Sequence, residues 1–178
     1  MQNYNIRQGE QSDLSWTAKI LEAGIDEGHF SKLLKNNCAP LIKAIINKDE
    51  IKFVGMRGKI DSTQRYNFDL LIAELNNIAV SFLVLKIGVD GVELHLAGTL
   101  KEHRRKGYFY ALANHVKEKY TKNTRLYARC YKKSTFAINA LEKLGFEKIK
   151  DGDPIELELK QEAPISLHQS ILKFLRVK

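Results

Sequence analysis

The stretch LKEHRRKGYFYAL, residues 100–112, decides the fold because it joins a strand pattern to a helix pattern. Before it, residues 92–100 begin by alternating polar and apolar side chains, which predicts a strand. After it, apolar side chains recur at helical spacing from Gly107 to Tyr120, which predicts a helix. A helix start presents free backbone N–H groups and the positive end of the helix dipole, so a turn entering one can bind phosphate. The basic residues 104–106 beside Gly107 strengthen that prediction.

The N-terminal segments predict a strand followed by helices. We expect a strand over 4–8, then an amphipathic helix capped by Ser12 or Asp13. A second helical region covers 30–47, and Pro40 is expected to start a new helix there, because proline fits the first turn of a helix. The next segment, 50–67, is typical of a loop or a short hairpin.

A run rich in Val, Ile, Leu and Phe predicts an antiparallel hairpin. Its strands are expected over 70–74 and 78–87, with the turn Leu75-Asn76-Asn77 between them. In the next strand, Gly98 interrupts the alternation, which indicates a bulge or a close approach of the backbone.

The region after the helix predicted from Gly107 to Tyr120 contains the patterns of a strand, a helix and two further strands. A strand is expected over 125–131, then a helix capped by Ser134 and stopped by Gly145. Strands over 146–150 and 155–160 complete a mostly antiparallel sheet. The composition changes after 160, so we expect one domain over 1–160, followed by a linker and a C-terminal amphipathic helix over 161–178.

Length and composition exclude several classes of protein. A chain of 178 residues corresponds to about one domain. Its 29 basic and 21 acidic residues leave a net charge of +8, which favours anionic partners. Cys38 and Cys130 lack the spacing of a zinc site or a disulfide scaffold, so no metal is expected. The sequence shows neither a secretion signal nor a membrane span, and we expect a cytoplasmic protein with no membrane partner.

Three segments resemble the GNAT acetyltransferase superfamily. RRKGYF at 104–109 is similar to the acyl-CoA motif Arg/Gln-x-x-Gly-x-Gly/Ala, and Ala111 and Leu112 follow it as in the family. STFAINALEKLGF at 134–146 resembles the family's Asn-x-x-Ala-x-x-x-Tyr-x-Lys-x-Gly-Phe segment. LIAELNNIAVSFLVL at 71–85 is similar to its second and third strands.

The resemblance implies an α/β GNAT acyltransferase fold: a mostly antiparallel, mixed central sheet flanked by helices, here with a short C-terminal helical extension. It implies an enzyme that transfers an acyl group, acetyl above all, from acetyl-CoA to an amine by direct attack. Pantetheine would lie along the strand that ends at Thr99, and the pyrophosphate would bind amides of the basic turn. The implied cofactor-binding residues are Ala97, Gly98, Thr99, Arg104, Arg105, Lys106, Gly107, Tyr108 and Phe109.

The catalytic groups stay open at this point. Glu93 or His95, on the strand before the turn, is the candidate general base, with a relay through water or another residue as the alternative. Leu141 replaces the tyrosine with which many members protonate the leaving thiolate, and Tyr131 and Tyr108 are its nearest substitutes in sequence. Phe109 and Ser134 also depart from the family pattern, at positions where a small residue and an asparagine are usual.

Two other functions remain as alternatives. The departures from the family pattern favour a non-catalytic GNAT-fold module that binds CoA or works through interactions. The net charge allows a nucleic-acid-binding domain, but the basic residues lack the aromatic interleaving of a single-strand binder, which argues against that partner. The acceptor amine is not specified by the sequence, and a monomer or a homodimer fits equally.

Overall fold

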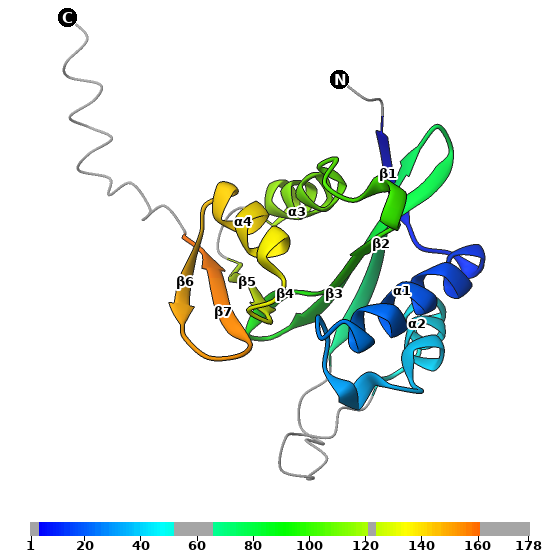
Figure 1. The fold of residues 1–178 in the computed structure, drawn as a ribbon, viewed down its shortest axis with the longest axis horizontal. Helices are drawn as coiled ribbons and strands as arrows, with labels where there is room; N and C mark the ends of the chain where they lie inside the picture. Colours follow the sequence, from blue (N-terminus) through cyan, green and yellow to red (C-terminus); the bar gives the residue numbers. More distant parts are fainter. Residues whose placement is uncertain (1–3, 52–65, 121–123, 161–178) are drawn as a thin grey trace, which may run out of the picture.

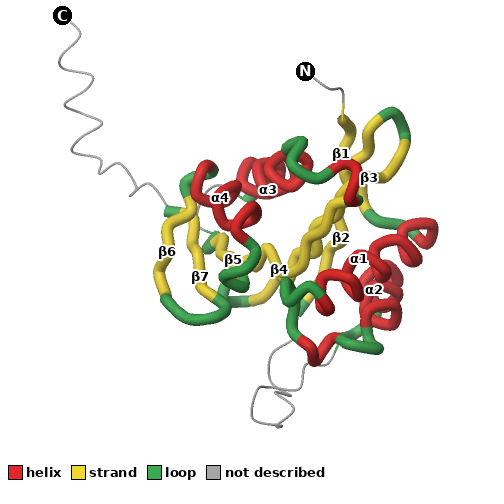
Figure 2. The backbone as a smooth tube through the Cα atoms, in the orientation of Figure 1, coloured by secondary structure: helices red, strands yellow, loops and turns green. Residues whose placement is uncertain are grey.

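The computed structural model describes residues 4–51, 66–120 and 124–160, which form one seven-stranded sheet with helices on both faces (Figures 1 and 2). The strands lie in the order β1-β2-β3-β4-β5-β7-β6. Every neighbouring pair is antiparallel except β4 and β5, which are parallel. Their bounds are β1 Tyr4–Gln8, β2 Asn67–Leu75, β3 Ile78–Gly88, β4 Gly91–Thr99, β5 Leu126–Cys130, β6 Phe146–Lys150 and β7 Ile155–Leu159. The mixed, mostly antiparallel sheet predicted from the sequence is confirmed.

The helices divide between the two faces of the sheet (Figure 1). One face carries α1 Leu14–Asp26 and α2 Cys38–Asn47, and the other carries α3 Tyr108–Lys119 and α4 Thr135–Lys143. Each face has its own apolar cluster. Leu21, Ile42 and Phe82 are fully buried in the first cluster, and Leu112 and Leu141 in the second. The sheet is therefore covered on both sides over its central strands.

The predicted β2–β3 hairpin and α3 form as expected. Asn76 and Asn77 both have positive φ, at 51° and 64°, as the favoured two-residue hairpin turn requires. Helix α3 runs from Tyr108 to Lys119 and buries its predicted apolar stripe. The glycine expected to stop α4, Gly145, adopts a φ of +94° directly after the helix.

The bulge in β4 lies at His95 instead of Gly98. Strand β3 pairs Val84 with Leu96 and Leu85 with Leu94, which leaves His95 as the extra residue. At Gly98 the structure shows the other predicted feature, a close approach of the backbone to a neighbouring element. A Cβ at this position would lie 2.5 Å from a methyl carbon of Ile20.

The region predicted as helical over 30–47 contains a 3₁₀ turn, Lys32–Leu34, and then α2. Helix α2 begins at Cys38, two residues before Pro40, where the helix start was expected. Pro40 still lies in the first turn, in which an amide hydrogen has no helical partner to lose. Most of the segment 50–67, expected to be a loop or a short hairpin, and the predicted C-terminal extension 161–178 lie outside the described residues.

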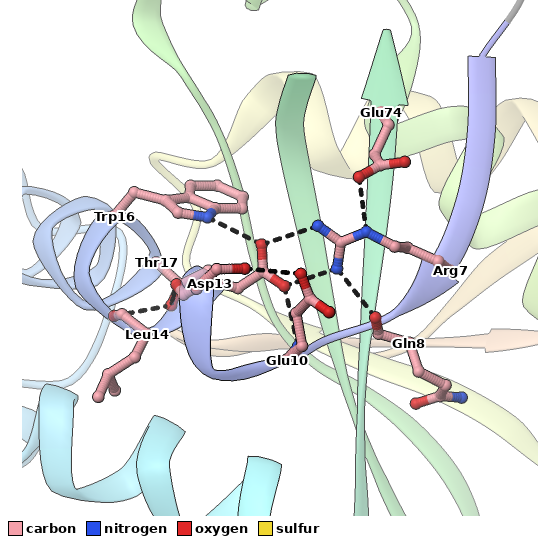
Figure 3. A network of polar contacts seen from close by, with 9 residues as sticks. Arg7, Gln8, Glu10, Asp13, Leu14, Trp16, Thr17 and Glu74 are labelled. Atoms are coloured by element: carbon pink, nitrogen blue, oxygen red, sulfur yellow. Dashed lines mark hydrogen bonds and ion pairs between the residues drawn. The ribbon is translucent and has the colours of Figure 1, made fainter. Parts of the chain in front are cut away.

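A buried ionic network fixes the start of α1 (Figure 3). Asp13, only 1% exposed, accepts hydrogen bonds from the Arg7 guanidinium, the Glu10 amide and the Trp16 indole. The remaining side of Arg7 donates to Glu74 of β2 at 2.6 Å. Of the two residues expected to cap α1, Ser12 and Asp13, it is Asp13 that occupies the N-cap position, but its carboxylate makes no cap hydrogen bond to a helix amide. It binds Arg7 of β1 and the entry to α1 instead, and Arg7 extends the network to β2.

Candidate active site

A cavity of about 930 Å³ opens where β4 ends and the N-termini of α3 and α4 come together. The turn before α3 forms one wall. Ile20 and Gly24 of α1, together with Phe30 from the following loop, form another. A cavity of this size can hold a large part of a nucleotide-bearing ligand.

The turn that enters α3 has the backbone of an anion site. Arg105 and Gly107 have φ values of 64° and 88°, and the first backbone bond of the helix runs from the Ala111 N–H to the Gly107 carbonyl. The amides before Ala111 therefore have no partner within the helix. The N-cap residue, Gly107, has no side chain with which to cap this end. Arg104 and Arg105 line the same wall, so backbone donors and positive charge coincide.

Eight of the nine residues predicted to bind the cofactor line this cavity. Lys106, the ninth, is exposed and lies outside its wall. Phe109 lines the cavity and also packs against the core under α3. Part of its bulk is therefore accommodated by the core. The eight are Ala97, Gly98, Thr99, Arg104, Arg105, Gly107, Tyr108 and Phe109.

The strands β4 and β5 separate beside the cavity. Their pairing covers only Val92 to Leu94 of β4, whereas β4 continues to Thr99. Beyond Leu94, the edge of β4 no longer has β5 as a neighbour, and Ala97, Gly98 and Thr99 from this part line the cavity. An extended ligand can form backbone hydrogen bonds with such an edge as an added strand does.

The predicted base candidates form a buried ionic cluster that does not belong to the described cavity wall. Glu93 is 1% exposed and accepts two hydrogen bonds from Arg129, each 3.0 Å long. His95 Nδ1 lies 3.0 Å from the same carboxylate. Burial alone would raise the pKa of Glu93, but the hydrogen bonds and charges of His95 and Arg129 outweigh it and lower the pKa to about 2. Glu93 is therefore a firmly charged carboxylate and a weak base.

Other groups near this cluster are held in their neutral forms. Burial, followed by the charge of Glu93, raises the pKa of Tyr127 to about 12 and that of Cys130 to about 11. Such a thiol is a poor nucleophile. Tyr131 follows β5 and, like Glu93 and His95, is not part of the described cavity wall.

The cavity also brings together residues that the sequence analysis did not connect. Glu27 and His29, after α1, face Ser134 at the start of α4. His103 is half-buried in the cavity wall, and its Nδ1 has no hydrogen-bond partner among the described residues. Lys133 and Lys143 add positive charge. No local pattern could pair these residues, because they lie on segments up to about a hundred positions apart.

The described residues, 4–51, 66–120 and 124–160, contain neither a metal-binding cluster nor a membrane-spanning helix. They contain no group of three or more His, Cys, Asp or Glu side chains arranged to hold a metal ion. None of the helices there has the length and apolar character needed to cross a membrane.

The divided sheet and the amide-lined turn at a helix start define the class: an α/β fold of the acetyltransferase type. The chain belongs to the acetyltransferase (GNAT) family, whose sequence model matches residues 42–146, more than half of its length. The resemblance drawn from the three sequence segments is thereby confirmed. No curated protein matches the chain significantly.

Solved structures of N-acetyltransferases share the fold. The PaiA N-acetyltransferase of Thermoplasma acidophilum, solved in complex with coenzyme A, has 15% identity and a TM-score of 0.67 over 89% of this chain and 99% of that one. The ribosomal-protein-S18-alanine N-acetyltransferase of Escherichia coli has 16% identity and a TM-score of 0.59, over 93% and 99% of the two chains. A further solved structure with this fold is PH1933 of Pyrococcus horikoshii OT3, whose name states no activity; it has 15% identity and a TM-score of 0.63, over 90% of this chain and 100% of that one.

Proposed function

We propose that the protein is an acyl-CoA-dependent N-acyltransferase that transfers acetyl from acetyl-CoA to an amine by direct attack. One observation carries this proposal: a single cavity joins the part of β4 that no longer pairs with β5 to the arginines and backbone of the turn that enters α3. The edge suits the amide-bearing pantetheine arm, and the turn suits the diphosphate. The acyl group would then lie near the point at which β4 and β5 separate.

His95 suits the role of general base better than Glu93. The Glu93 carboxylate accepts a hydrogen bond from His95 Nδ1, so in the neutral imidazole Nε2 is the nitrogen that can take a proton. His95 precedes Ala97 of the cavity wall by two residues, about 7 Å along the strand. An amine approaching the thioester from that side would meet the imidazole, and Glu93 would orient the ring.

Acetyl-CoA should stabilise the protein against heat. A ligand at 100 times its dissociation constant raises the free energy of unfolding by about 2.7 kcal/mol, which corresponds to a rise of about 5–10 °C in Tm for a chain of this size. We expect that shift with acetyl-CoA and CoA, and a smaller one with adenosine alone. Differential scanning fluorimetry measures it, and an unchanged Tm with every short-chain acyl-CoA would contradict the proposal.

Replacing Gly107 with Ala should weaken CoA binding about 10- to 100-fold, because the loss of one amide hydrogen bond to a charged group costs about 1.5–3 kcal/mol. A Cβ at Gly107 meets no protein atom within 4 Å, but its φ of +88° strains any other residue and would displace the turn. Titration calorimetry with CoA measures the loss.

The matched control for this variant is Gly145→Ala. Gly145 has a similar φ of +94°, and an added Cβ would make only an ordinary contact with Leu159. Both variants should lose similar stability, but Gly145→Ala should keep the affinity for CoA. Equal affinities in the two variants would refute the role given to Gly107.

A second candidate is a CoA-binding module without transferase activity. Leu141, the residue in place of the family's tyrosine, is fully buried in the core under α4 and offers no acid. Release of CoA in the presence of a polyamine, an aminoglycoside, a peptide N-terminus and a lysine peptide separates the candidates. A module would show the shift in Tm without turnover above hydrolysis.

A further inference from the structure

Ser134 has an unexpected hydrogen-bond partner inside the cavity. It is the N-cap residue of α4, where a serine hydroxyl normally accepts a bond from a helix amide, yet its side chain makes no cap hydrogen bond. Its Oγ lies 3.0 Å from Nδ1 of His29, a residue 105 positions away in the loop after α1. The pair therefore joins two walls of the cavity across its interior.

A carboxylate extends this pair on its far side. His29 Nε2 lies 3.6 Å from Glu27 Oε2, and the side chains of Ser134, His29 and Glu27 all line the cavity. A hydroxyl, an imidazolium and a carboxylate in series can move a proton, because an imidazolium donates through Nδ1 while the carboxylate lies on its Nε2 side. The same Glu27 oxygen also lies 3.8 Å from Arg104 Nη1. With Nδ1–H donating to Ser134, the Ser134 hydroxyl hydrogen is left for another acceptor, and Ser134 lines the cavity.

The transfer reaction requires an acid at this place. When the amine nitrogen bonds to the carbonyl carbon, the carbon–sulfur bond breaks and its electron pair leaves on sulfur. A thiolate at neutral pH takes up a proton, and a positioned acid accelerates its departure. Ala97 and Gly98, the proposed strand for pantetheine, line the same cavity as Ser134, so a pantetheine arm bound along that strand would place the sulfur of CoA in the cavity that Ser134 lines.

We propose that Ser134 Oγ donates the proton to the departing sulfur of CoA and that His29 resupplies it. This inference rests on the proposed transferase function. The sulfur takes the hydroxyl hydrogen of Ser134, the Ser134 oxygen takes the hydrogen from His29 Nδ1, and Glu27 balances the positive charge of His29 before transfer. The proton lost by the attacking amine returns to His29 through solvent, so the cycle closes without another reactant.

The other proton donors of the neighbourhood fit this role less well. Tyr108 and Tyr110 line the cavity, but both lie in the first turn of α3, at the proposed diphosphate end, and Tyr108 is only 3% exposed and packs in the core cluster. Tyr131 and Cys130 do not line the described cavity. His103 does, but it lies in the turn before α3, at the proposed diphosphate end.

The leaving group itself provides the test. Ser134→Ala and His29→Gln are assayed with acetyl-CoA and with its selenoester analogue, using the amine of the panel above that gives the highest turnover. Selenols are stronger acids than thiols, so selenolate departs with little need of an acid. We expect kcat with acetyl-CoA to fall about 10- to 100-fold in both variants, and the fall with the selenoester to be less than about threefold.

Ser12→Ala and His115→Gln are the matched controls, because both residues are exposed and lie outside the cavity wall. Equal losses with the thioester and the selenoester, or no loss with either, would overturn the relay while leaving the transferase function intact. Absence of turnover by the unaltered protein with every amine would instead overturn the proposed function and the relay with it.

A second readout needs no turnover. The side-chain nitrogen resonances of His29, assigned by comparison with His29→Gln, are recorded with CoA and with desulfo-CoA, which lacks the sulfur. We expect them to shift with CoA and to differ clearly between the two ligands. The same spectrum with both ligands would show that the relay does not reach the sulfur, and the proposal would be wrong.

Discussion

Replacement of His95 with Gln is expected to lower kcat about 100- to 10,000-fold, the usual range for the loss of a general base. Glutamine fills a similar space but has no nitrogen that can accept a proton. The residue lies in the bulge of β4, outside the described cavity wall, so affinity for acetyl-CoA should stay within about twofold of the original value. Steady-state kinetics combined with calorimetry separates these two quantities.

His115→Gln, on the exposed side of α3, is the control for the same substitution and should keep full activity. A variant His95→Gln with unaltered kcat would contradict the role of the imidazole. A large fall in acetyl-CoA affinity with little change in kcat would place His95 in cofactor binding instead.

The low pKa of Glu93 allows the choice of His95 over Glu93 as the general base to be tested by the pH dependence of the activity. A carboxylate with a pKa of about 2 stays charged throughout the neutral range, so it adds no inflection to the pH dependence of kcat/KM above about pH 4. An inflection above pH 4 that disappears in Glu93→Gln and remains in His95→Gln would identify Glu93 as the base.

The elements around the turn could be predicted because their signals are local. The apolar stripe of α3 and the glycine before it lie within fourteen residues, and the Asn76-Asn77 turn specifies the hairpin by its own backbone preference. The order of these segments was enough to indicate the GNAT family. Eight predicted residues then meet in one cavity, since a strand end and the helix start that follows it are close in any such connection.

What could not be predicted depends on contacts between distant segments. The bulge at His95 is a property of the register between β3 and β4, and neither strand alone contains it. Ser134 is a common N-cap residue, so the sequence favours a cap over a bond to His29. The sequence likewise favours a side-chain cap at Asp13, but in the structure the Asp13 carboxylate accepts hydrogen bonds from Arg7 of β1 and makes no cap hydrogen bond.

That carboxylate leads to the largest expected loss of stability. Asp13→Asn keeps the size of the side chain but removes the buried negative charge that faces Arg7, and breaking a buried ion pair costs about 3–5 kcal/mol. For a chain of this length the loss corresponds to about 6–20 °C in Tm. The matched control is Asp26→Asn. Asp26 pairs with Lys35 at 3.4 Å with both side chains exposed, so its change should cost less than about 1 kcal/mol.

The contribution of Asp13 should also depend on pH. Burial raises the pKa of this carboxyl, but the hydrogen bond from Arg7 and those from Glu10 and Trp16 more than offset it and leave the pKa below its usual value. A folded pKa lowered in this way gives stability that is complete above about pH 4 and is lost as the pH falls further. Urea denaturation should therefore show a difference between the original protein and Asp13→Asn that is largest near neutral pH and shrinks below pH 4.

The same variant should affect the cavity through a chain of contacts. The Trp16 indole donates to Asp13 and packs edge-on against Phe82, with ring centres 5.8 Å apart. A Cβ added to Gly98 would lie only 2.7 Å from Phe82, so this ring supports the cavity wall directly. Asp13→Asn should therefore weaken CoA binding as well as lower Tm, whereas Asp26→Asn should do neither. A variant of Asp13 that loses stability but binds CoA as tightly as before would show that the network holds α1 without shaping the site.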